Sequence, residues 1–156
     1  MAKRIEDDLT DRARQAEDAS AIIGASTVTY GALLRWSAGI AEALERAGVR
    51  RGDRVAVWTG KSSAEVASLY GAWLAGAIVV PVHDVLKRPQ VQHVLEHCDA
   101  RAVLATGRLA TQLDEGLREG RVVLDPTRIE PATARARALP GDDEPAALLY
   151  TSGSTG

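Results

Sequence analysis

The sequence predicts an α/β fold, built from layered βαβ units around a mostly parallel sheet. Short apolar runs rich in β-branched residues recur near residues 56, 79, 103 and 123. Stretches with the spacing of amphipathic helices lie between these runs. The runs are apolar on both faces, which is typical of parallel strands that helices cover on both sides.

The first unit is a helix followed by a strand. The apolar residues of the helix share one face: Leu33, Ile40, Leu44 and Ala47. The helix is predicted to end at Gly48, and Arg51, Gly52 and Asp53 then form a turn. This turn leads into a strand over residues 55–57.

The second unit has the clearest signals. Ser62 and Glu65 form a candidate capping box, in which each side chain satisfies a free backbone donor of the other. The predicted buried face of this helix has helical spacing: Val66, Leu69, Tyr70, Trp73 and Leu74. Gly76 supplies a left-handed helix end. A strand over residues 78–80 follows and ends at Pro81.

Two further units complete the alternation. Pro89 suits a first helical position, and the stripe on that helix consists of Val91, Val94, Leu95 and Cys98. Strands are predicted over residues 102–104 and 122–124, with a helix over residues 109–117 between them. Residues 126–145 are predicted to be an exposed connection, because they are rich in Pro, Ala, Arg and acidic residues. Residues 146–150 are predicted to form one more apolar strand.

Composition restricts the class of protein. The 156 residues have the length of one domain, with 46% hydrophobic and 26% charged residues. A net charge of −2 argues against nucleic-acid or acidic-membrane partners, because those usually require a concentrated basic face. The single cysteine, Cys98, fits a reducing compartment. No apolar stretch is long enough to span a bilayer, and a cytoplasmic location is expected.

The last six residues combine glycines with hydroxyl side chains: Thr151, Ser152, Gly153, Ser154, Thr155 and Gly156. Glycines let the backbone approach a ligand closely, so that successive N–H groups can point at one anion. The hydroxyls add neutral donors without bulk. This composition suits a phosphate-binding loop, and it suits a flexible Ser/Gly linker or a simple turn equally well.

Three blocks in this sequence resemble motifs of the adenylate-forming superfamily, which includes acyl-CoA synthetases, peptide-synthetase adenylation domains and luciferases. Residues 150–156, YTSGSTG, resemble the signature loop. Residues 29–33, TYGAL, continuing to 47–57, AGVRRGDRVAV, resemble the first core motif and the strand after it. Residues 71–82, GAWLAGAIVVPV, resemble the second. The resemblance implies the incomplete N-terminal subdomain of an AMP-binding enzyme over residues 1–156.

The resemblance implies a two-step reaction. A carboxylate attacks the α-phosphate of ATP, which gives an acyl-adenylate and pyrophosphate, and the acyl group then passes to a thiol, commonly that of coenzyme A. Mg²⁺ normally neutralises charge on the phosphates. The implied roles are hydroxyl or backbone donation to the β- and γ-phosphates by Thr151, Ser152, Ser154 and Thr155, with Gly153 and Gly156 permitting close approach.

The sequence departs from the family pattern after Gly156. Members continue with Pro-Lys-Gly and later supply groups for adenine, ribose and Mg²⁺, so we expect this chain alone to be inactive. The alternative is a non-catalytic module that binds nucleotide or pairs with a separately encoded remainder. We also expect an unpaired apolar edge at residues 146–150, through which copies of the chain associate or at which the chain frays.

Other candidates favour structural interpretations. Gly60, Lys61 and Ser62 resemble the end of a Walker A motif, but Val55 occupies the place of its first glycine, which favours a helix start. His93 and His97 share a helix face without a third ligand nearby. The three tryptophans, Trp36, Trp58 and Trp73, favour core packing over base stacking. His83 and Asp84 follow the strand over residues 78–80, at the end where α/β sheets place ligands.

Overall fold

A computed structural model describes residues 5–134 and 144–151. Four parallel strands form its main sheet, in the order β4-β3-β5-β6. Their bounds are β3 (Arg54–Trp58), β4 (Ile78–Pro81), β5 (Ala100–Ala105) and β6 (Val122–Leu124). Each of these strands contains one of the predicted runs, so the α/β fold class and the parallel sheet are confirmed.

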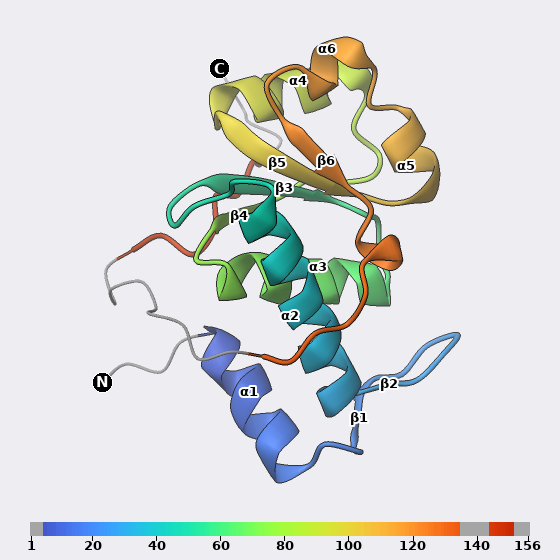
Figure 1. The fold of residues 1–156 in the computed structure, drawn as a ribbon. Coiled ribbons are helices and arrows are strands. Elements are labelled where there is room, and N and C mark those ends of the chain that lie inside the picture. The colour runs from blue at the N-terminus through green and yellow to red at the C-terminus, as the bar shows by residue number, and fades with distance from the viewer. Residues whose placement is uncertain (1–4, 135–143, 152–156) are drawn as a thin grey trace.

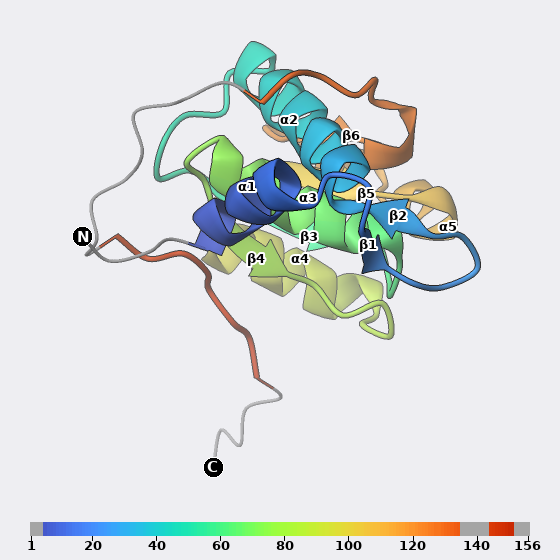
Figure 2. The ribbon, with the colours of Figure 1, turned by 90° about the horizontal axis from the view of Figure 1, so that it is seen from below.

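Helices cover both faces of the sheet (Figure 1). The helices α2 (Tyr30–Arg46) and α3 (Ser63–Leu74) lie on one face, and α1 (Ile5–Gln15) packs outside them. The helices α4 (Arg88–His97), α5 (Gly107–Thr111) and α6 (Glu115–Arg118) lie on the other. Figure 2 shows the same arrangement from below, with α1 and α2 on the near side of the sheet and α4 behind it.

Two apolar cores result, one on each face of the sheet. Alternate residues of β3 point to opposite faces: Val55 and Val57 join the core under α2 and α3, whereas Ala56 and Trp58 join the core under α4. All four are buried. This two-sided burial explains why the strands read as continuous apolar runs.

The predicted helix over residues 109–117 is two short helices, α5 and α6, separated by a turn. Asp114 caps α6 by accepting a hydrogen bond from the backbone N–H of Leu117 at 3.0 Å. Its carboxylate also pairs with the guanidinium of Arg88 at the start of α4, and this pairing holds the pKa of Asp114 below its usual value. Asp114 therefore starts a second helix after α5 has ended at Thr111.

The buried face of α3 differs from the predicted one. Of the predicted residues, only Leu74 is buried, and Val66, Leu69, Tyr70 and Trp73 are half-buried. The buried positions are mainly small: Ala64, Ala67, Ser68, Gly71, Ala72 and Leu74. The helix lies between the sheet and the pair α1 and α2, so small residues allow close approach while the larger ones fill the margins.

Three elements lie before α2 that the sequence pattern did not predict. The helix α1 carries only two buried apolar residues, Leu9 and Ala13. A short antiparallel pair, β1 (Ser20–Ile22) and β2 (Val28–Thr29), then leads to the start of α2. The side chain of Thr29 caps α2 by accepting a hydrogen bond from the N–H of Ala32.

Part of residues 126–145, the predicted exposed connection, packs against α2. A short 3-10 helix, η1 (Pro126–Arg128), begins with a buried proline. The indole N–H of Trp36 donates to the carbonyl of Pro126 at 2.8 Å. Residues 135–143 lie outside the described part of the chain.

The predicted strand over residues 146–150 is wrong as a regular element. These residues, which we call the docked segment, form a single parallel bridge to β4 at Val79. The N–H of Val79 donates to the carbonyl of Ala146 at 3.0 Å, and the N–H of Leu148 donates to the carbonyl of Val79 at 2.8 Å. The next donor along β4 would be Pro81, which has no N–H, so the ladder ends there.

Candidate functional site

The docked segment leads directly into the predicted phosphate-binding loop, and three side chains from the body of the domain contact it or its approach. The indole N–H of Trp73 donates to the carbonyl of Ala146 at 2.8 Å. The guanidinium of Arg51 pairs with the carboxylate of Glu144. Near the other end of the docked segment, Nδ1 of His97 and the hydroxyl of Tyr150 are 2.7 Å apart.

Tyr150 lies between the core under α4 and the exposed start of the loop. Its ring meets the ring of His97 edge-on, with centroids 5.6 Å apart. Leu148 packs against the same core from within the docked segment. Burial raises the pKa of the Tyr150 phenol, so this group is a neutral hydrogen-bonding partner near pH 7.

Of the predicted site residues, the structure describes only Thr151, which is exposed. Its hydroxyl is a neutral donor of the kind that suits a phosphate ligand. The other predicted residues, Ser152, Gly153, Ser154, Thr155 and Gly156, lie outside the described residues. Their phosphate-binding role therefore stays a prediction.

The described residues offer no ready site for Mg²⁺. Within residues 5–134 and 144–151, no group of three or more His, Cys, Asp or Glu side chains is placed to hold a metal ion. His93 and His97 share one face of α4, with ring centroids 5.6 Å apart. His97 is engaged with Tyr150. We therefore assign Mg²⁺ to none of the described side chains.

Cys98 points into the core under α4, on a different side of the helix end from the histidines. Burial raises the pKa of the Cys98 thiol, and the side chain is only 6% exposed. Less thiolate is then present at a given pH than in the unfolded chain, and reagents cannot reach it. At pH 8 we expect Ellman's reagent to label native Cys98 at least about 100-fold more slowly than the urea-unfolded chain. Equal labelling rates would contradict the buried position.

A second polar cluster lies at the carboxyl ends of the strands. The Thr106 hydroxyl at the end of β5 donates to the carbonyl of Thr59 at the end of β3, at 3.1 Å. After β4, Nδ1 of His83 lies 2.9 Å from the carboxylate of Asp84. Burial raises the pKa of Glu65, and the nearby Asp84 carboxylate raises it further. The Thr106–Thr59 hydrogen bond joins two neighbouring loops, and both polar pairs follow strand ends, where α/β sheets place ligands.

The helix-start interpretation of Gly60, Lys61 and Ser62 is confirmed. Ser62 is the N-cap of α3, and its hydroxyl accepts a hydrogen bond from the N–H of Glu65 at 3.3 Å. Gly60 has a positive φ of 67°, which suits glycine at this turn. The turn therefore starts a helix, as the sequence indicated.

All three tryptophans pack against one of the two apolar cores, as expected. Trp58 is buried under α4. Trp36 and Trp73 are half-buried, and each donates its indole N–H to a backbone carbonyl of a later segment. They attach the chain after β6 to the helices α2 and α3.

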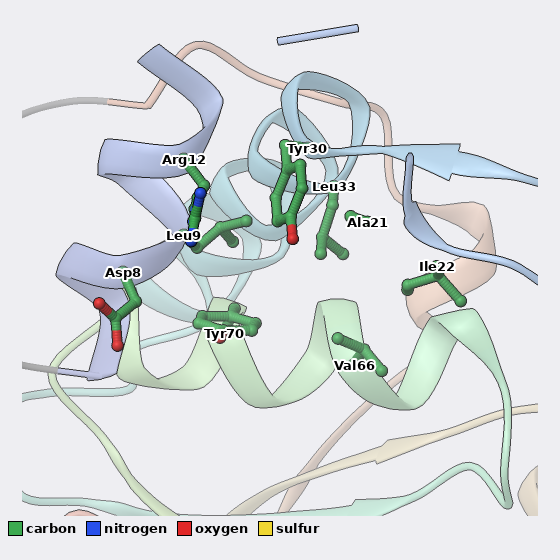
Figure 3. A pocket seen from close by; sticks show the side chains of 9 residues that line it. All are labelled: Asp8, Leu9, Arg12, Ala21, Ile22, Tyr30, Leu33, Val66 and Tyr70. Atoms are coloured by element: carbon green, nitrogen blue, oxygen red, sulfur yellow. The ribbon is translucent and has the colours of Figure 1, made fainter. Parts of the chain in front are cut away.

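One cavity of about 430 Å³ lies between α1, β1, α2 and α3 (Figure 3). Apolar and polar side chains line it: Asp8, Leu9, Arg12, Ala21, Ile22, Tyr30, Leu33, Val66 and Tyr70. Burial raises the pKa of Tyr70, and the neighbouring Asp8 carboxylate raises it further. Thr151, the one predicted site residue that the structure describes, does not line this cavity, so we do not assign the cavity to the phosphate site.

The contacts of the docked segment were not predictable from the sequence. His97 and Tyr150 are separated by 53 positions, and no periodic pattern joins them. Trp73 was predicted to lie on the buried face of a helix, and its donation to Ala146 appears only in the folded structure. The composition of the loop and the resemblance of residues 150–156 to a signature loop were the sequence signals for this segment, and neither indicated its contacts.

Comparison with known proteins gives a consistent result. The AMP-binding enzyme family matches residues 9–156. Feruloyl-CoA synthase from Amycolatopsis sp. is 37% identical, over 93% of this chain and 30% of the relative. Phenyloxazoline synthase MbtB from Mycobacterium sp. (strain MCS) is 32% identical, over 99% of this chain and 14% of the relative. The chain thus spans less than a third of the length of these curated relatives.

A solved structure supports the same assignment. The AMPPNP-bound form of the nonribosomal peptide synthetase FmoA3 matches with a TM-score of 0.84 and 33% identity, over 94% of this chain and 16% of that chain. No helix in the described ranges is long and apolar enough to cross a membrane. The family match covers nearly the whole sequence, and the parallel sheet agrees with it. The chain therefore belongs to the AMP-binding enzyme family and has the fold of the N-terminal subdomain of adenylate-forming enzymes.

Proposed function

We propose that the chain supplies the N-terminal part of an ATP-dependent ligase, which joins a carboxylic acid to AMP and then transfers the acyl group to a thiol. The family match through residue 156 is the observation that supports this proposal most strongly. In this proposal Thr151, Ser152, Gly153, Ser154, Thr155 and Gly156 hold the β- and γ-phosphates of ATP.

The chemistry of such a loop follows from its donors. ATP and the attacking carboxylate are both anionic, so the enzyme must hold them together and stabilise the charge on the phosphates. Thr151 is exposed and directly follows the docked segment, a position from which it could meet a ligand. When bound, Mg²⁺ would supply charge neutralisation on the phosphates.

Titration of the purified chain with Mg-ATP tests the proposal. We expect saturable heat for the wild-type chain, and at least about tenfold weaker binding for Gly153→Val, because a branched side chain keeps the backbone donors away from the phosphates. Gly24→Val is the matched control, since a Cβ at Gly24 has no neighbour closer than 4.0 Å. Absence of heat with the wild-type chain would contradict nucleotide binding.

The acyl acceptor separates two versions of the proposal. Coenzyme A is favoured by the 37% identity to a feruloyl-CoA synthase. Another thiol acceptor is the second candidate, because the similar solved structure is a nonribosomal peptide synthetase. A thioester assay on the polypeptide that naturally carries this sequence, with ATP, a panel of carboxylic acids and coenzyme A, distinguishes them. Acyl-CoA product supports the first version, and adenylate formation without acyl-CoA supports the second.

The non-catalytic alternative concerns the 156 residues by themselves. They span 30% of the feruloyl-CoA synthase, and we expect them to show no ATP–pyrophosphate exchange when purified alone. A module that pairs with a separately encoded remainder would gain exchange activity when that remainder is added. Exchange by the isolated chain would show that these residues are sufficient for catalysis.

The outer side of the docked segment is a candidate surface for self-association. Leu149 is 75% exposed, and the segment pairs with β4 on one side through Val79. An apolar, extended edge of this kind is a template for pairing with another chain. We expect the apparent mass in sedimentation experiments to rise with concentration, and Leu149→Lys to reduce this rise. A monomer at all concentrations would exclude association through this edge.

A further inference from the structure

We propose that Trp73 and His97 are positioning residues for the phosphate-binding loop, because they hold the two ends of the docked segment that precedes it. This inference rests on the proposed function, since it assigns a role toward ATP through that loop. Neither residue is proposed to touch the nucleotide. Their effect on binding would pass through the backbone of residues 146–151.

Trp73 fixes the point where the segment joins the sheet. Its indole N–H and the backbone N–H of Val79 both donate to the carbonyl of Ala146, at 2.8 Å and 3.0 Å. The indole itself is held edge-on against the ring of Tyr70, with centroids 5.5 Å apart. The carbonyl of Ala146 is therefore located by donors from two different elements, α3 and β4.

His97 fixes the end of the segment next to the loop. It lies in the last turn of α4, a helix whose other face is anchored in the core by Val94 and Leu95. Its Nδ1 lies 2.7 Å from the Tyr150 hydroxyl, and the two rings meet at 87°. Tyr150 directly precedes Thr151, so this pair fixes the residue from which the loop starts.

Anchoring matters because the loop sequence consists of Gly, Ser and Thr. A Gly- and Ser-rich loop loses much conformational freedom when it wraps a triphosphate, and that loss weakens binding. Fixing the residue before the loop removes part of the loss in advance, without a new contact to the ligand. Removing one of these two anchoring hydrogen bonds should weaken Mg-ATP binding by about threefold to tenfold.

The test compares matched pairs of variants in the same chain. Trp73→Phe and Trp36→Phe each remove an indole N–H that donates to a backbone carbonyl at 2.8 Å, but only Trp73 contacts the docked segment. His97→Ala removes the partner of Tyr150, whereas His97→Asn returns a polar atom close to the position of Nδ1. His93→Ala removes a ring one turn earlier on α4.

For each variant we would measure the dissociation constant of Mg-ATP, the free energy of unfolding, and hydrogen exchange of the Leu148 amide. The expected result is weaker binding and faster exchange at Leu148 for Trp73→Phe and His97→Ala, with recovery in His97→Asn. Trp36→Phe and His93→Ala should bind as the wild-type chain does, even where they unfold more easily. A purely structural role would instead make affinity follow stability in all five variants.

Two outcomes overturn the inference in distinguishable ways. Equal Mg-ATP affinity in the wild-type chain, Trp73→Phe and His97→Ala would overturn the positioning role and leave the proposed function intact. Absence of Mg-ATP binding by the wild-type chain would overturn nucleotide binding by the loop, and the positioning role with it.

Discussion

Gly71→Ala is expected to lower the free energy of unfolding by about 1–2 kcal/mol, although alanine is the better helix former. A Cβ at position 71 would lie 2.6 Å from Cγ2 and 2.7 Å from Cβ of Ile40, and 3.0 Å from the carbonyl oxygen of Ser37. Ile40 is fully buried on α2, and its Cβ cannot rotate away from the contact because it is bonded to the backbone. The two helices must therefore separate.

The sign of this effect depends on two opposing contributions. The change from glycine to alanine in a helix interior favours folding by about 1 kcal/mol. Overpacking in a close helix contact typically costs about 1–3 kcal/mol, and separation of α2 from α3 also loosens the core beneath them. At this site the clash involves a branched, buried carbon atom, so the cost is expected to exceed the gain.

Urea unfolding of the variant measures the effect, and Gly116→Ala is its matched control. A Cβ at Gly116 in α6 would have its nearest neighbour at 3.4 Å, at the end of the flexible Arg88 side chain. At position 116 the higher helix propensity of alanine acts almost alone. The free energy of unfolding should therefore stay the same or rise by up to about 1 kcal/mol. If Gly71→Ala were as stable as the wild-type chain, the close contact of α2 and α3 would be wrong.

The order of helices and strands could be predicted because burial on both faces leaves a strong signal. Residues 55–57 and 102–104 are apolar without alternation, as expected for strands with a core on each side. Gly48 and Gly76 have positive φ values of 87° and 74° at the ends of α2 and α3. Glycine has no Cβ to oppose that conformation, so these ends were visible in the sequence.

The buried face of α3 could not be predicted from hydrophobicity, because hydrophobicity ranks large side chains first. Close approach of helices selects residues with little volume, such as Ala67 and Gly71. The helix α1 was missed for a related reason: Leu9 and Ala13 are its only buried apolar residues within the described chain. Its position depends on α2 and α3, which its own pattern does not encode.

The phosphate-binding loop could be proposed from its composition, whereas the contacts that hold the segment before it could not be predicted. Glycines and hydroxyls at residues 151–156 indicated phosphate chemistry. The strand expected before them depended on local apolar character, and Pro81 on the neighbouring strand limits the pairing to one bridge. The anchoring contacts of Trp73 and His97 join distant parts of the chain, so only the folded structure brings them together with the docked segment.

Arg54→Met is expected to lower the free energy of unfolding by about 2 kcal/mol, because one guanidinium serves three backbone carbonyls. Arg54 begins β3, and it donates to the carbonyls of Cys98 at 2.7 Å, Gly52 at 3.1 Å and Asp99 at 2.9 Å. Two of these carbonyls lie at the end of α4, where the helix dipole favours a positive charge. Methionine retains much of the side-chain volume and removes all three donors.

The carboxylate of Asp99 contributes little to this effect. It lies 2.8 Å from the guanidinium of Arg54, but its side chain is 92% exposed, so water screens the ion pair. Asp99→Asn should therefore change stability by less than about 0.5 kcal/mol, and asparagine also tolerates the φ of 50° at this position. Arg101→Met, at an exposed arginine of β5, controls for the loss of charge alone. If Asp99→Asn cost as much as Arg54→Met, the ion pair rather than the carbonyl contacts would hold α4 to the start of β3. If Arg54→Met cost no more than Arg101→Met, neither the ion pair nor the carbonyl contacts would hold α4 to the start of β3.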